Sequence, residues 1–112
     1  MSALSDKMRK AREVRINADK YVFVALRPTP LERQEKFRVG ESSKAIMSFV
    51  VGWENVVESD LIPGGDPHPL KFDQDACSEW LSDRPDLFSA VVDGIITAYD
   101  EYASKLDAEL GN

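Results

Sequence analysis

Histidine is the commonest catalytic base in proteins, and this chain of 112 residues has one, His68. It lies in the segment Asp66-Pro67-His68-Pro69, whose composition predicts a loop. A zinc site would need further His or Cys ligands, and none lies nearby in sequence. We therefore interpret His68 as a solvated loop residue. A small enzyme or ligand-binding domain built around this loop is kept as a rival hypothesis.

Cys77 is the only cysteine, so no internal disulfide can form and a reducing cytoplasm is the expected location. A thiol becomes a nucleophile when a base or a helix N-terminus lowers its pKa, and Cys77 does fall near the start of a predicted helix. However, Asp73, Asp75 and Glu79 lie around it and would raise that pKa. We predict that Cys77 faces inward as a small apolar residue.

Two other motifs resemble ligand sites only in part. Gly64-Gly65-Asp66 lacks the Lys-Ser/Thr that follows the glycines of a phosphate-binding loop. Asp66, Asp73 and Asp75 lack the central glycine and the bidentate Glu of a calcium loop, and capping of a helix explains Asp73. We predict a protein with no catalytic residues, no cofactor and no metal.

The charge of the chain is divided unevenly between its two ends. Residues 1–38 hold ten Lys/Arg and five Asp/Glu, whereas residues 39–112 hold four and fifteen, which together give the net charge of −6. The acidic remainder would repel phosphate, so nucleic-acid binding is disfavoured, while attraction between the ends of neighbouring subunits remains open. Apolar runs are far shorter than the ~20 residues that span a bilayer, so no membrane association is expected.

The elements that would position these residues begin with a β-hairpin. Alternating apolar residues predict strands within 14–26, with a turn over 17–20 and with Tyr21 and Phe23 on one face. The preceding residues 1–13 offer only a short polar helix over 6–13, which would fray unless a partner stabilises it.

A helix is predicted over residues 30–38. Thr29 is its N-cap, Pro30 takes the first helical position and Glu32 completes a capping box. Gly40 is expected to break it, and Ser42 or Ser43 to cap the next helix. That next helix would bury the stripe Ile46, Phe49/Val50, Trp53 and Val56/Val57, spaced by three and four residues.

Two more helices follow a Pro/Gly loop over 62–70. Phe72 and Asp73 start the first, which turns Cys77, Trp80 and Leu81 inward. The second begins at Pro85, runs to residue 110 and ends at Gly111 as a left-handed cap. Its inward stripe is Phe88, Val91/Val92, Ile95, Tyr99, Tyr102 and Leu106. At about 39 Å it is longer than the ~26 Å body expected for this chain length, so its last turns should project or meet another subunit.

We therefore predict a mainly α (α+β) fold in a single domain over residues 1–112. It has a short N-terminal β-hairpin (14–26) followed by four to five helices in a helical body (30–112). Trp53 and Trp80, at helical spacing on apolar faces, are interpreted as core residues rather than ligand-stacking ones. Tyr99, Tyr102, Leu106 and Leu110 form a stripe that could belong either to the core or to a partner or subunit interface.

The order of these segments resembles the tail assembly chaperones of lambda-like bacteriophages, which have long non-contractile tails. The similar residues are the strand into RPTPLE (Arg27–Glu32), FVVGWENVVESD (Phe49–Asp60), the helix from Phe72, and DRPDLFSAVVDGIITAYDEY (Asp83–Tyr102). The resemblance covers residues 14–112 and carries no catalytic signature. Arg27, Glu32 and Trp53 match the family pattern, and they, with Phe72 and Trp80, are given structural roles.

The resemblance implies a non-enzymatic protein of the bacterial host cytoplasm, absent from the finished virion. It would bind the tape-measure protein, recruit tail-tube protein as the tube polymerises, and form homo-oligomers. The main alternative is a virion structural protein, such as a head–tail connector or a tail-completion protein. A generic regulatory adaptor is a further rival.

Overall fold

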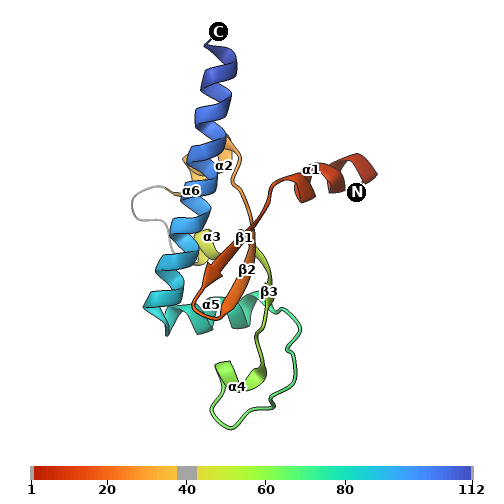
Figure 1. Cartoon of the computed structure of the whole chain (residues 1–112), viewed down its shortest axis with the longest axis vertical. Coiled ribbons are helices and arrows are strands. Elements are labelled where there is room, and N and C mark those ends of the chain that lie inside the picture. The colour runs from red at the N-terminus through yellow and green to blue at the C-terminus, as the bar shows by residue number, and fades with distance from the viewer. Residues whose placement is uncertain (1, 38–42, 112) are drawn as a thin grey trace.

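A small antiparallel sheet packs against one long helix, with shorter helices around them (Figure 1). The computed structural model describes residues 2–37 and 43–111. The elements are α1 (Ala3–Ala11), β1 (Glu13–Ala18), β2 (Tyr21–Leu26), α2 (Pro30–Lys36), α3 (Ser43–Met47), β3 (Val50–Glu54), α4 (Glu58–Leu61), α5 (Gln74–Ser82) and α6 (Pro85–Leu110). The predicted α+β class is confirmed, with five helices after the hairpin in the described residues.

The predicted hairpin is confirmed as β1 and β2, in which Ile16 pairs with Phe23. The turn is shorter than expected, because pairing continues to Ala18 and Tyr21 and leaves only Asp19 and Lys20 between them. Asp19 has φ 57°, a left-handed conformation that Asp tolerates better than most residues. Ile16, Tyr21 and Phe23 are buried on the inner face.

The helix predicted across Ile46 to Val57 is wrong, since its centre is the strand β3, hydrogen-bonded to β2 in the sheet order β1-β2-β3. Val50 pairs with Ala25 and Gly52 with Val24, which leaves Val51 as the extra residue of a β-bulge. The bulge shifts the alternation, so that Val50 and Trp53 both face the core although they are three positions apart. Two buried residues three positions apart, a spacing typical of a helix, thus occur in a strand.

The predicted capping box at the start of α2 is present. The Thr29 hydroxyl accepts a hydrogen bond from the Glu32 amide (3.2 Å), and the Glu32 carboxylate accepts one from the Thr29 amide (2.9 Å). The expected break at Gly40 and cap at Ser42 lie outside the described residues. Residues 43–47 keep helical structure as α3.

The loop after α4 and the start of α5 follow the prediction. Residues 62–70 contain no helix or strand apart from an isolated bridge between Val57 and Pro69. The Asp73 side chain caps α5 by accepting a hydrogen bond from the Ala76 amide at 3.0 Å. Cys77, Trp80 and Leu81 are buried, as predicted.

The long helix α6 is continuous for 26 residues, with Pro85 in its first turn. It buries Leu87, Val91 and Ile95. Phe88, predicted on the inward stripe, is only partly buried. A Cβ on Gly94 would lie 2.7 Å from Cγ1 of Ile16, so the helix backbone lies directly against β1. The left-handed cap predicted at Gly111 is wrong, because its φ is −80°.

Two helices leave the body of the molecule. The last turns of α6 extend past the other elements, and α1 projects from the start of β1 (Figure 1). The principal extents are 56 × 35 × 24 Å and the radius of gyration is 15.4 Å, above the ~13 Å of a compact chain of this length. Among residues 2–37 and 43–111, no helix combines the length and the apolarity needed to cross a bilayer.

Candidate functional site

The stripe Tyr99, Tyr102, Leu106 and Leu110 runs along one side of α6 toward its exposed end, because steps of three and four return to the same face of a helix. The side chains of Tyr99, Tyr102 and Leu106 are half-buried. Leu110 is 76% exposed. The stripe therefore passes from a partly covered base to an open tip.

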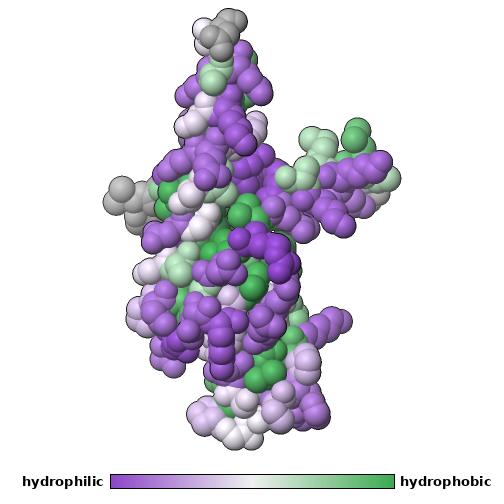
Figure 2. Space-filling view, in the orientation of Figure 1, coloured by the Kyte–Doolittle hydropathy of each residue, from purple (hydrophilic) through white to green (hydrophobic). Residues whose placement is uncertain are grey.

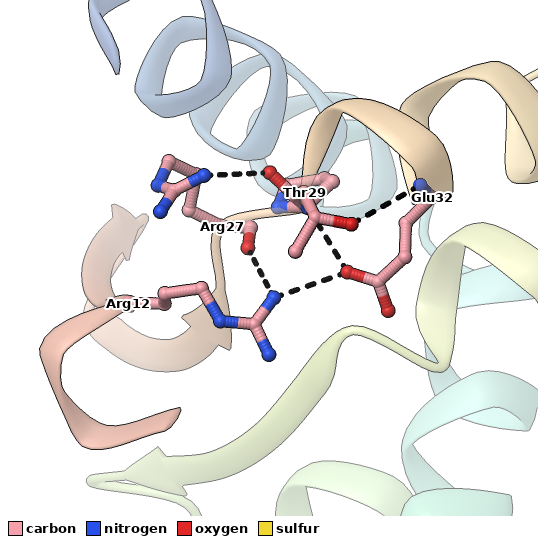
Figure 3. Close-up of polar contacts among 5 residues, drawn as sticks. Arg12, Arg27, Thr29 and Glu32 are labelled. Carbon is pink, nitrogen blue, oxygen red and sulfur yellow. Dashed lines mark hydrogen bonds and ion pairs between the residues drawn. The ribbon is translucent and has the colours of Figure 1, made fainter. Parts of the chain in front are cut away.

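The base of the stripe meets the Arg27-Pro28-Thr29-Pro30 segment, which a polar network holds in place (Figure 3). The Arg12 guanidinium donates hydrogen bonds to the Arg27 carbonyl (3.2 Å) and to the Glu32 carboxylate (3.0 Å). Burial opposes ionisation of Glu32, but the Thr29 amide and Arg12 outweigh it and lower the pKa of this carboxyl. One charged pair thus ties the start of β1 to α2.

Two arginines cover the tyrosines. The Arg27 guanidinium lies 3.7 Å from the centre of the Tyr102 ring, and the Arg33 guanidinium lies 5.7 Å from that of Tyr99. Burial lowers the pKa of Arg27, although an arginine stays charged at neutral pH. Each cation–π contact at such a half-buried site contributes about 0.5–2 kcal/mol. The tyrosines are therefore fixed in orientation, Leu106 is half-buried and Leu110 is the exposed end of the stripe.

The structure adds an exposed apolar residue that the sequence analysis did not select, Leu31 of α2, which is 70% exposed. It lies two positions before Arg33, on the helix whose other side meets α6. A leucine directly after the N-terminal Pro30 in an otherwise polar helix was the available signal.

The structure brings Trp53, Phe72 and Trp80 together, away from the α6 stripe. The Trp53 ring makes edge-to-face contacts with Phe72 (5.0 Å between centres) and with Trp80 (6.1 Å). The Trp53 indole N–H donates a hydrogen bond to the Leu70 carbonyl at 2.8 Å. These contacts hold the loop 62–70 against the sheet, which is a structural role.

A groove of about 430 Å³ lies between α4, the loop and α5. We call it the acid-rimmed groove, and it is lined by Glu58, Leu61, Ile62, Leu70, Lys71, Asp73, Ala76, Glu79, Trp80 and Asp83. Four carboxylates and one lysine thus surround an apolar floor. Sequence reasoning missed it, because its walls come from segments distant in sequence that Trp53 brings together through its contacts with Leu70 and Trp80.

His68 and Cys77, the two residues considered first as candidate catalytic groups, do not line the acid-rimmed groove. His68 has an 83% exposed side chain, and its Nε2 is 3.6 Å from an oxygen of Asp66. Burial raises the pKa of the Cys77 thiol to about 12; the neighbouring acids, expected to cause this shift, are not its source. In the described part of the chain, no three His, Cys, Asp or Glu side chains are grouped so that they could hold a metal ion.

No protein family, no curated protein and no solved structure matches this chain.

Proposed function

We propose that this protein is a non-enzymatic tail assembly chaperone of bacteriophages with long non-contractile tails. It binds the tape-measure protein in the host cytoplasm, promotes polymerisation of the tail tube and self-associates. The observation that carries the proposal is the open end of α6, where Leu106 and Leu110 continue a stripe whose tyrosines are already fixed by Arg27 and Arg33. The order of segments from Arg27 to Tyr102, which resembles this family, supports the same conclusion.

The chemistry of the stripe suits a helical partner. An amphipathic helix docks through apolar residues spaced by three and four positions, and the stripe has the same spacing. The rigid tyrosines lose little side-chain entropy when a partner covers them. A net charge of −6 helps to keep a complex with a long apolar helical protein in solution.

Co-expression of the chain with the tape-measure protein tests the proposal. The wild-type chain should raise the soluble fraction of the tape-measure protein and co-purify with it. A Leu106→Asp/Leu110→Asp variant should lose both effects, because two charges would enter the apolar contact. A Thr97→Asp/Ser104→Asp variant places the same two charges on the opposite, exposed side of α6 and should behave like the wild type.

Two outcomes would overturn the proposal. One is a tape-measure protein that stays insoluble and uncomplexed in the presence of the wild-type chain. The other is recovery of the chain from purified virus particles in stoichiometric amounts, which would favour the virion structural proteins named above.

A further inference from the structure

The N-terminal helix α1 carries an apolar stripe that the rest of the molecule does not cover. Leu4 is 68% exposed and Met8 is 63% exposed, and α1 buries none of its residues. The opposite, polar side of α1 faces the body, where Asp6, Arg9 and Lys10 line a shallow hollow beside the sheet. Figure 2 shows hydrophobic residues on the outer side of this projecting helix. This is the reverse of an ordinary amphipathic helix, whose apolar side packs inward.

The acid-rimmed groove has the complementary features. Its floor is apolar and includes Leu61, Leu70 and Trp80, while Ile62 at its edge is 58% exposed. Its lining holds four acidic side chains and one lysine, whereas α1 holds three basic side chains and one aspartate. Apolar contact along the floor and charge attraction at the rim would act together.

A chain cannot place α1 in its own groove. The C-terminal end of α1 is fixed by Arg12. The Arg12 guanidinium donates a hydrogen bond to the Glu32 carboxylate, and the Arg12 carbonyl accepts one from the Arg27 amide at 2.8 Å. The groove lies beyond the other end of the hairpin, where Tyr21 contacts Trp80. From Glu13 to Ala18 the strand spans about 17 Å at ~3.4 Å per residue, whereas the nine residues of α1 span about 13 Å at ~1.5 Å per residue.

We propose that α1 of one copy of this chain docks in the acid-rimmed groove of a second copy. Leu4 and Met8 lie on the apolar floor, and Lys7 faces carboxylates of the rim such as Glu79, while Arg9 and Lys10 stay on the side of α1 that faces its own body. The two surfaces differ, so a bound pair leaves the helix of one copy and the groove of the other free. Such a head-to-tail contact builds rings or open chains rather than a closed dimer. The inference rests on the self-association part of the proposed function, and binding of the tape-measure protein uses the separate surface on α6.

Sedimentation velocity of the full chain over a range of concentrations tests this contact. The wild type should show a mass that rises with concentration, and added salt should shift it toward the monomer by screening the rim charges. The Leu4→Glu/Met8→Glu variant should associate ~100-fold more weakly, since it loses two apolar contacts and gains charges that repel the rim. Both side chains are exposed, so the fold should be intact by circular dichroism.

Mixing two defective variants separates a head-to-tail contact from a symmetric one. An Ile62→Lys/Glu79→Lys variant has a blocked groove and an intact helix, whereas Leu4→Glu/Met8→Glu has the converse. Each alone should be monomeric, and an equimolar mixture should form a 1:1 dimer that cannot grow. As a control for the α6 surface, Leu110→Glu should associate like the wild type.

The proposal is overturned if the wild type is monomeric at every concentration, if either groove or helix variant associates normally, or if the mixture stays monomeric. It is also overturned if Leu110→Glu abolishes association, because the contact would then lie on α6. None of these results depends on the tape-measure protein, so failure of the co-expression test remains distinguishable.

Discussion

Replacement of Gly94 by alanine tests how closely α6 lies on the sheet. A methyl group at this position would meet three atoms of the Ile16 side chain at 2.7–2.8 Å. Ile16 is β-branched, only 6% exposed and paired with Phe23, so it has little room to move away. Overpacking of this kind costs about 1–3 kcal/mol, while the change from Gly to Ala in a helix recovers ~1 kcal/mol.

We therefore expect Gly94→Ala to lower the free energy of unfolding by about 1 kcal/mol, measured by urea denaturation followed by circular dichroism. Thr97→Ala, at an exposed position of the same helix, measures the effect of helix propensity alone and should raise the free energy of unfolding by up to ~0.7 kcal/mol. In an Ile16→Ala background the obstructing atoms are absent, so Gly94→Ala should become stabilising. The reasoning is refuted if Gly94→Ala is stabilising in the wild-type background or shows no coupling to position 16.

Three further predictions concern hydrogen bonds. Burial and the bond to Asp60 raise the pKa of Tyr21 from 10.0 to about 12, so stability present below pH 10 should fall as the pH rises to 12, and Tyr21→Phe should flatten that fall in urea titrations. Glu32 has a lowered pKa, so its contribution to the free energy of unfolding should be lost as the pH falls below 4.5. Glu32→Gln should remove this acid sensitivity and should cost ~0.5–1 kcal/mol of stability at neutral pH, measured by thermal unfolding. Trp53→Phe loses the bond to Leu70 and should cost about 1–3 kcal/mol, with faster amide exchange in the loop 62–70 by mass spectrometry.

Opposite outcomes would contradict each of these. An unchanged alkaline slope in Tyr21→Phe would remove the buried phenol as its cause. A Glu32→Gln variant that keeps the acid transition would show that the charge of this residue contributes nothing to it. Loop exchange unaffected in Trp53→Phe would mean that other contacts close the loop.

The parts of the fold that were predicted correctly depend on local signals. The side chains of Thr29 and Asp73 accept hydrogen bonds from backbone amides in the first turn of their own helices, and Pro85 has no amide N–H that would need a partner there. These signals can be recognised without the rest of the chain. The hairpin was equally local, because its two strands are separated by a turn of two residues.

The errors arose where partners are distant in sequence. β3 needs β2 for its hydrogen bonds, and the bulge at Val51 gave Val50 and Trp53 the spacing of a helix. The stripe on α6 was predicted, but the cover that Arg27 supplies to Tyr102 joins residues 75 positions apart in the chain. Leu4 was missed because the helix was predicted to start at residue 6, whereas α1 begins at Ala3.

The close packing of α6 against β1 has a consequence for synthesis of the chain. Roughly 70 residues separate the end of the hairpin at Leu26 from Gly94, so at about 5–20 residues per second the ribosome needs several seconds to deliver the covering helix. During that interval Ile16, on the inner face of the hairpin, is not yet covered by α6. Nascent copies on neighbouring ribosomes are therefore exposed to mispairing until α6 emerges.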